Sequence, residues 1–459
     1  MKRPNVVLIY TDQQRWDTIA AGGNPAVETP NLDALAARGA LFNHAYANCP
    51  VCMPSRMSML SGRYPGALGI RCNGTEMPAD IECMHNVLKR YNYHTANIGK
   101  LHFKNHASQY RDHRTPHPTY GFDTLILSDE PGCYDDAYIK WVAERDADAV
   151  DDCRCDTPPA WTGQAVQVHP RRTTEPYVFD GPEQLSHTAF VAEETSEYIR
   201  LHQDEPFFCI AGIYAPHAPI NPPARFVELY NEDEMTLPHR NEGENTDDLT
   251  DAMWRKVKAY YYALVSHIDD QVGRILETLD ECGLRDDTIV IFTSDHGENL
   301  GDHGRTGKGH WYDSSTRVPL LVSWPRAFAS GQVRDELIEA VDIAPTVLDC
   351  CGVQQPPLMQ GHSFRPLLAG GAYTPRQSVF MELANRPKTG WKGVRTHDHL
   401  YVRRGDGSEL LYDLASDPHQ LQDTATAAAS HEALHAMRGE MLRRWFDAER
   451  IDPVRTGQY

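Results

Sequence analysis

Four apolar segments of the sequence are each followed at once by polar side chains that suit metal or anion chemistry. In chain order, these side chains are Asp12 and Gln13, Lys100 and His102, His217, and Asp295 with His296. A single polar residue after a strand is commonplace. In an open α/β sheet, however, ligands bind beyond the carboxyl ends of the strands, so these groups are expected to meet along one edge. The pattern predicts a site for a metal ion, an anion or both.

The metal hypothesis rests on the carboxylates. Asp12 and Asp295 offer the oxygen ligands that hard divalent cations prefer, and His296 or Gln13 would complete the set. An Asp-His pair after a strand, taken alone, is more simply a helix cap or a salt bridge, but opposite Asp12 it favours a metal. Lys308, in "GRTGKGHWYD", lies in a Gly-rich loop that would place a cation over a bound anion. Without the other candidate site residues, Lys308 would be interpreted as a solvated loop lysine.

The stretch "CPVCMPSRMSMLSGRYP" places Cys52 close to a proline, a serine and an arginine. Pro54 suits the first turn of a helix, so we expect Cys52 just ahead of a helix N-terminus, where unpaired N–H groups favour negative charge. Arg56, four residues on, would reach back toward it. The expected helix N-terminus, with Arg56 nearby, would favour the binding of an anion next to Cys52. A buried structural cysteine and an ordinary thiolate nucleophile remain alternatives, although the local sequence has no histidine to serve as a base for the thiolate.

The segments that position these residues predict an α/β fold. Strands are expected at Asn5–Tyr10, in "YHTANIGK", in "PFFCIAGIY" and in "TIVIFTS", and their continuous apolar runs are typical of parallel strands covered on both faces. Helices are predicted over about 31–40, with Gly39 as the stop, and over 84–89, 185–201, 254–282 and 343–350. Residues 106–184 are predicted to form a substrate-shaping insertion, and 231–251 a second polar excursion.

The composition shifts near residues 361–371. Beyond them come "SVFMEL", "GVRTHDHLYVRR" and "ELLYDL", then a helix at about 431–445. We therefore predict a catalytic domain at 1–370 and a smaller C-terminal subdomain at 371–459, made of an antiparallel sheet and a helix.

The formal net charge of the 459-residue chain is -20, with 64 acidic and 44 basic residues. Nucleic-acid binding would need a basic surface, which is not visible. The apolar run after the N-terminus is too short for a signal peptide, and no run approaches the length of a membrane span, so we expect a cytoplasmic protein. The 11 cysteines are irregularly spaced and are expected to be reduced thiols. Cys49 and Cys52 form a C-x-x-C without a thioredoxin-like context, so a thiol-redox function is the weakest alternative.

With these motifs in order, the sequence resembles the sulfatase family of the alkaline-phosphatase-like superfamily over nearly its whole length. "CMPSR" followed by "MSMLSGRYP" is similar to the family signature whose cysteine is oxidised to Cα-formylglycine. "NIGKLHF" resembles the second signature, and "TPNLDALAARG", "VSHIDDQVGRILETL", "FTSDHGENLGDHG" and "LYDLASDPHQ" fit further stretches in order. The resemblance implies a large mixed, mainly parallel sheet between helices, with a small C-terminal α+β subdomain.

By resemblance, Cys52 is the formylglycine precursor, and a formylglycine-generating enzyme is a partner. One hydroxyl of the aldehyde hydrate, held on the metal, would attack sulfur of a small anionic ester, and the alcohol would leave. The second hydroxyl would then expel sulfate and restore the aldehyde. A plain serine or cysteine lacks that second hydroxyl. The family resemblance, rather than a feature of this sequence, is the basis for expecting a homo-oligomer.

The resemblance also assigns roles to individual residues. Asp12, Asp295 and His296 would hold one divalent metal, with the Cys52-derived group on it and Gln13 as a candidate further ligand. Arg56 would hold the formylglycine, and Lys100 and Lys308 would clamp sulfate oxygens. His102 would support the hydrate or accept its proton. His217 would protonate the leaving alcohol.

The sequence departs from the family at two metal positions. Many sulfatases have two adjacent acids where this chain has Asp12-Gln13, and Asp-Asn where it has Asp295-His296. Calcium is the family default, but magnesium or manganese would fit the smaller negative charge. The same pattern resembles the phosphonate monoester hydrolases, whereas "GKLH" is typical of sulfatases. We therefore expect hydrolysis of a sulfated sugar or a small aryl or alkyl sulfate, with phosphonate monoester or phosphodiester hydrolysis as the alternative. A binding protein with unmodified Cys52 is a third hypothesis.

Overall fold

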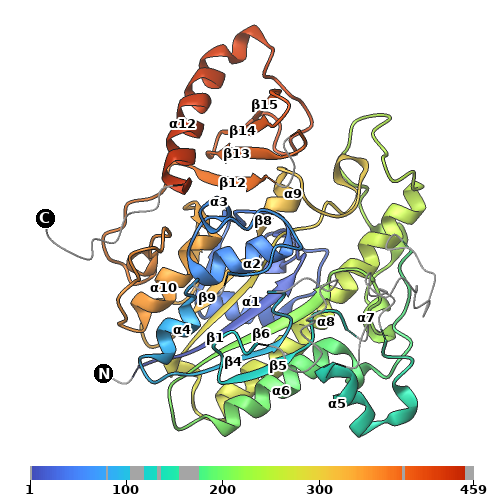
Figure 1. Ribbon diagram of the computed structural model, residues 1–459. Coiled ribbons are helices and arrows are strands. Elements are labelled where there is room, and N and C mark those ends of the chain that lie inside the picture. Colours follow the sequence, from blue (N-terminus) through green and yellow to red (C-terminus); the bar gives the residue numbers. More distant parts are fainter. Residues whose placement is uncertain are drawn as a thin grey trace, which may run out of the picture.

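The structure, a computed structural model, describes residues 3–78, 81–103, 118–131, 136–154, 175–384 and 388–449. Its largest element is an eight-stranded sheet (Figure 1). In spatial order its strands are β10 (Gln332–Arg334), β2 (Ala40–Phe42), β9 (Leu320–Ser323), β7 (Thr288–Ser294), β1 (Asn5–Asp12), β6 (Phe207–Pro216), β4 (His94–Gly99) and β5 (Thr124–Leu127). The strands from β7 to β5 are parallel, and β9 runs antiparallel to both of its neighbours. The predicted mixed, mainly parallel sheet is confirmed.

Helices cover both faces of this sheet, which explains the continuous apolar strands. In β1, Val7 and Ile9 pack into the core on one face, and Val6 and Leu8 pack into the core on the other. The first face is covered by α1 (Pro30–Ala37), α5 (Ala137–Arg145), α6 (His187–Leu201), α7 (Ala224–Val227) and α8 (Asp251–Glu281). The second is covered by α2 (Cys52–Ser61), α4 (Met84–Lys89) and α10 (Ile343–Cys350), with the short α3 (Pro65–Leu68) and α11 (Arg365–Leu368).

Two predicted boundaries differ from the structure. The helix expected over 31–40 ends at Ala37, because Ala40 already belongs to β2. Between them, the backbone of Gly39 approaches β9 so closely that a Cβ would lie 2.2 Å from the Val322 carbonyl oxygen. Within the predicted 106–184 insertion, β5 pairs with β4, so this part of the range belongs to the main sheet.

The C-terminal part forms the predicted antiparallel sheet with a helix. Its strands are β12 (Val379–Leu383), β13 (Trp391–Arg395), β14 (His399–Arg404) and β15 (Glu409–Asp413), followed by α12 (His431–Glu449). The run "GVRTHDHLYVRR" therefore contains the end of β13 and all of β14. One face of the sheet packs on α12, and the other packs against Tyr46, Cys49, Tyr312 and Leu337 of the preceding part of the chain. A small sheet of β11 (Ile338–Glu339), β3 (Ala45–Tyr46) and β8 (Arg317–Val318), with α9 (Asp313–Thr316), lies near this junction.

A buried charge network joins the two parts. Glu339 accepts hydrogen bonds from the Arg444 guanidinium at 2.6 Å and from the Phe380 backbone N–H at 2.6 Å, and it pairs with Arg376 at 3.1 Å. The carboxylate is fully buried. Because an unpaired buried charge is strongly destabilising, these partners fix α12 and the C-terminal sheet to β11.

No helix in the described ranges is both long and apolar enough to cross a bilayer. The nine cysteines that the structure describes are all free thiols, in agreement with the expectation of reduced cysteines.

Candidate active site

The sheet brings the predicted residues to one edge. Because β7, β1, β6 and β4 are parallel neighbours, their carboxyl ends lie side by side (Figure 1). Thr11 pairs with Ser294 and Asp12 with Pro216, so Asp295 and His217 emerge on either side of Asp12. The convergence predicted from four separate segments is therefore observed.

Helix α2 presents Cys52 to this edge. Cys52 is itself the first helical residue, one step later than the predicted position just ahead of the helix, and Val51 before it is extended. Its side chain is buried at the first turn of the helix, where the Met53 N–H donates to Asn73 Oδ1 at 3.0 Å. Its Sγ lies 2.9 Å from Lys308 Nζ, 3.2 Å from His296 Nε2 and 3.8 Å from Asp12 Oδ1.

The Cys52 thiol is not arranged as an ordinary thiolate nucleophile. Burial, assisted by the charge of Asp12, raises its pKa to about 11, although Lys308 acts in the opposite direction. At neutral pH the side chain is therefore a protonated thiol, which is a poor nucleophile. This electrostatic setting disfavours the thiolate interpretation of Cys52.

Four side chains form a cluster that fits a metal ion. One ligand atom from each of Asp12, Cys52, Asp295 and His296 lies within 4.8 Å of the others, and all four residues are buried. His296 Nδ1 lies 2.9 Å from the Gly297 carbonyl oxygen, which only accepts, so Nδ1 carries the proton. The lone pair of Nε2 therefore faces Asp12 and Asp295, at 3.7 and 3.5 Å, as a metal-binding histidine requires.

Three cations surround the two carboxylates. Arg56 Nε donates to Asp295 Oδ2 at 2.8 Å and its Nη2 to Asp12 Oδ2 at 3.5 Å. Lys100 Nζ lies 2.8 Å from the same Asp12 oxygen. Burial raises the pKa of Asp12, but Lys100 and Lys308 outweigh it and hold that pKa well below its usual range. Arg56 thus contacts the two carboxylates, two backbone carbonyls and the face of the Tyr10 ring, rather than Cys52 as its spacing suggested.

Lys100 and His102 are held in place by two acids that the sequence analysis did not identify. Asp129 Oδ1 accepts the backbone N–H groups of Leu101 and His102, both at 2.8 Å. Glu130 lies 3.7 Å from Lys100 Nζ. Both acids follow β5, and His102 adopts a positive φ of 59°. In sequence, "SDEPG" reads as an ordinary turn, and only the pairing of β5 with β4 could have revealed it.

Gln13 and Lys308 share a third buried acid. Lys308 Nζ donates to Gln13 Oε1 at 2.8 Å, and Gln13 Nε2 donates to Glu298. Glu298 also accepts the Gly307 N–H, next to Lys308 in the Gly-rich loop. The Gln13 amide oxygen therefore faces Lys308, and its role as a metal ligand stays a prediction. The sequence analysis did not identify Glu298, because in "DHGENLGDHG" it assigned site roles only to Asp295 and His296.

His217 lies at the rim of the cluster and is half-buried. Its Nδ1 donates to the Ala218 carbonyl oxygen at 2.8 Å, which leaves the lone pair on Nε2. Burial and the charges of Lys308 and Lys100 lower its pKa to about 3, so the ring is neutral at pH 7. A bound anion between the two lysines would raise that pKa. Trp161 and Arg171, two candidate pocket residues within the predicted 106–184 insertion, lie outside the described residues.

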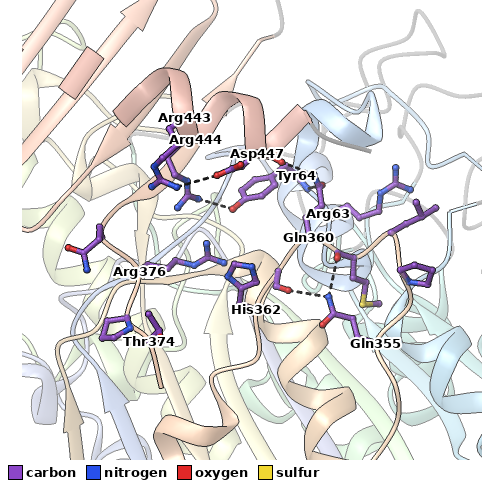
Figure 2. Close-up of a pocket in the computed structure, with 16 residues that line it drawn as sticks. Arg63, Tyr64, Gln355, Gln360, His362, Thr374, Arg376, Arg443, Arg444 and Asp447 are labelled. Atoms are coloured by element: carbon purple, nitrogen blue, oxygen red, sulfur yellow. Dashed lines mark hydrogen bonds and ion pairs between the residues drawn. The ribbon is translucent and has the colours of Figure 1, made fainter. Parts of the chain in front are cut away.

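A separate cavity lies away from this site. A cavity of about 730 Å³ lies at the junction with the C-terminal subdomain (Figure 2). It is lined by Arg63, Arg376, Arg443 and Arg444. The last three pair with acids of the chain, namely Glu339, Asp342, Glu440 and Asp447. Because these charges offset one another, the cavity lacks the surplus positive charge that an anion site needs.

Comparison with known proteins agrees with this geometry. The sulfatase family profile matches residues 4–353, and the profile "N-sulphoglucosamine sulphohydrolase, C-terminal" matches residues 301–445. An arylsulfatase of Clostridium perfringens is 28% identical, covering 96% of this chain and 94% of that protein. The multifunctional alkaline phosphatase superfamily protein PehA of Trinickia caryophylli is also 28% identical, covering 93% and 92%.

Among solved structures, the phosphonate monoester hydrolase of Agrobacterium radiobacter superposes with a TM-score of 0.85. It is 26% identical, and the alignment covers 97% of this chain and 96% of that one. The family profile spans most of the chain and includes every residue of the cluster. The chain therefore belongs to the sulfatase family of sulfuric ester hydrolases.

Proposed function

We propose that the protein hydrolyses sulfate esters with a Cα-formylglycine formed from Cys52, beside a divalent cation held by Asp12, Asp295 and His296. The observation that carries this proposal is the position of Cys52. Its side chain starts α2, within 4 Å of Lys308, His296 and Asp12. A nucleophile at this point lies next to both the candidate metal ligands and a cation that can bind an ester oxygen.

The donor set supports a hard divalent cation. Two carboxylates and one correctly protonated imidazole would suit calcium, magnesium or manganese. The nitrogen ligand favours manganese among these, and the smaller negative charge than in the family pattern would suit magnesium or manganese. When bound, the cation would supply Lewis-acid stabilisation of an oxygen nucleophile. The formylglycine hydrate would supply two hydroxyls on one carbon, one to attack sulfur and one to expel sulfate.

The remaining residues divide the work around the ester. Lys100 and Lys308 would each donate to a non-bridging sulfate oxygen, where negative charge develops. Arg56 would keep the carboxylates of Asp12 and Asp295 oriented. His217 Nε2 would transfer a proton to the leaving alcohol once the bound anion has raised its pKa, and His102 would accept a proton from the hydrate.

Phosphonate monoesters or phosphodiesters are the second candidate substrates. Two observations favour them: Gln13 and His296 replace the more acidic family pattern, and the likeness to a phosphonate monoester hydrolase covers almost the whole chain. The test compares kcat/KM on aryl sulfate and aryl phosphonate esters with the same leaving group. A higher value for the phosphonate would reject the sulfatase assignment and leave the nucleophile proposal intact.

The nucleophile itself is tested by mass spectrometry of the peptide that contains Cys49 and Cys52. The protein is produced together with a formylglycine-generating enzyme, and fragment ions locate the change. We expect an aldehyde oxygen in place of the thiol at Cys52 only. Buried Cys49, three residues earlier, is the internal control and should keep its thiol. An unmodified Cys52, with a control sulfatase fully converted in the same cells, would reject the proposal in favour of the binding-protein hypothesis.

A further inference from the structure

Helix α12 carries two apolar stripes, of which only one is covered by the chain described here. The inner stripe packs on the C-terminal sheet and consists of Leu434, Met437, Met441 and Ala448. The outer side of the helix bears Leu442, Trp445 and Phe446, which are 68%, 36% and 73% exposed. Eight large apolar side chains in the described ranges are at least 36% exposed, and three of them fall within residues 442–446. Such a cluster marks an interaction surface.

A gap adjoins the exposed side chains. Gly439 lies on the same face as Leu442 and Phe446, because residues three and four apart share a helix face. A Cβ added to Gly439 would meet nothing within 4 Å, so no contact in the described part of the chain explains a glycine there. Glycine weakens a helix interior. The outer stripe, defined as Gly439, Leu442 and Phe446, therefore has a hollow half and a bulky half.

We propose that this outer stripe is the surface on which two copies of the chain associate, with their α12 helices antiparallel. Placing Phe446 of one copy opposite Gly439 of the other also places Phe446 of the second opposite Gly439 of the first. Leu442 then lies next to the two-fold axis, against Leu442 of the other chain. A stripe with its bulky residues at one end and its hollow at the other is self-complementary only in this arrangement.

The charges beside the stripe favour the same orientation. Arg438, which already pairs with Glu409 of its own chain, and Glu449, which lies 3.6 Å from Lys392, are on one flank. The antiparallel register brings Arg438 within two residues of the partner's Glu449, about 3 Å along the axis, so the two pairs can join in one network. Parallel helices would instead bring Arg438 to the partner's Arg443. In the antiparallel pair Arg443 approaches Arg443 of the other copy, but in each chain Glu440 and Asp447 already pair with this arginine. Exposed pairs of this kind set orientation more than affinity.

The surface is accessible and small. Figure 1 shows α12 along the outer side of the C-terminal sheet, and the hollow of Figure 2 lies against its last turn. Two helices alone bury less than the roughly 1,200 Å² of a standard stable interface, so the dimer should be concentration-dependent. The competing occupant is the chain's own residues 450–459, which follow α12 directly.

Sedimentation velocity of the full chain over about 1 to 100 μM tests the proposal, because this range brackets a weak interface. The wild type is expected to move from the mass of one chain, 51.7 kDa, toward twice that mass. Phe446→Glu should weaken association by about a hundredfold or more, since it buries an unpaired charge. The matched control is Leu201→Glu on α6, a leucine that is 76% exposed, and it should leave association unchanged.

Gly439→Leu separates this interface from a merely structural role. Filling the hollow should abolish association while raising the melting temperature of the monomer, because leucine favours a helix more than glycine does. A wild type that stays monomeric throughout would overturn the proposal. So would association that survives Gly439→Leu, or a Phe446→Glu variant whose only effect is a lower melting temperature, which would assign the stripe to the chain's own C-terminal residues.

Discussion

Replacing Lys100 with methionine tests the most deeply buried cation of the site. Lys100 is fully buried, its Nζ lies 2.8 Å from Asp12 and 3.7 Å from Glu130, and it stands 4.5 Å from the centre of the Tyr214 ring. Methionine keeps most of the volume of the side chain and removes the charge. Two separate effects follow, one on catalysis and one on stability.

For catalysis, the change removes a buried donor that, in the proposed function, binds an ester oxygen. Loss of one such donor lowers kcat by about 10² to 10³, or roughly 2.7 to 4 kcal/mol. For stability, breaking a buried ion pair costs about 3 to 5 kcal/mol, because the acid partners are left uncompensated. Arg56 and Lys308 still face Asp12, so the loss should fall at the lower end of that range.

The double variant Lys100→Met/Glu130→Gln distinguishes the two effects. Removing the charge of Glu130 should restore much of the melting temperature but none of the activity. The assay is kcat/KM on an aryl sulfate, with unfolding followed in urea, and Glu130→Gln alone as the control. If either Lys100 variant retained more than about a tenth of the wild-type kcat/KM, the anion-clamp role of Lys100 would be refuted.

Three further predictions concern buried carboxylates. Glu298→Gln places an amide against the Gln13 amide and should lower kcat/KM on the aryl ester about 10-fold to 100-fold, because a buried donor is left unsatisfied; an unchanged value would contradict this. Burial raises the pKa of Asp136 to about 7, above its unfolded value of about 4, so the native state binds the extra proton and stability falls as pH rises from 4 to 7. Asp136→Asn should flatten this fall in melting temperature, and an unchanged slope would count against it. Glu339→Gln should lower the free energy of unfolding in urea by about 3 to 5 kcal/mol, whereas the exposed control Glu281→Gln should change it by less than about 1.

The sequence predicted the centre of the fold and of the site because both depend on local patterns. Continuous apolar runs identified β1, β4, β6 and β7, and each run ends at a side chain with its own chemistry. Parallel pairing alone then requires Asp12, Lys100, His217 and Asp295 to meet. The position of Cys52 followed in the same way from the helix-start signals around Pro54.

The supporting acids depend on tertiary pairing and could not be predicted in this way. Asp129 acts through backbone N–H groups of a loop 27 and 28 residues away, and Glu298 acts through a side-chain amide 285 residues away. Neither contact leaves a period or a spacing in the sequence. The reach of Arg56 toward Cys52 was inferred from helix spacing, but two buried carboxylates, Asp12 and Asp295, compete for the guanidinium and hold it.

Charge alone cannot decide between the two candidate substrates. The chain carries a net charge of -20, yet Arg56, Lys100 and Lys308 gather around Asp12 and Asp295, and the background is screened beyond about 10 Å. A sulfate ester and a phosphonate monoester each bring one negative charge and would be attracted equally. They differ in shape, because sulfate has three non-bridging oxygens where a phosphonate has two and a carbon substituent. Selectivity must therefore arise where a cation meets the third oxygen. A lysine whose replacement lowers sulfate turnover more than phosphonate turnover would mark that position.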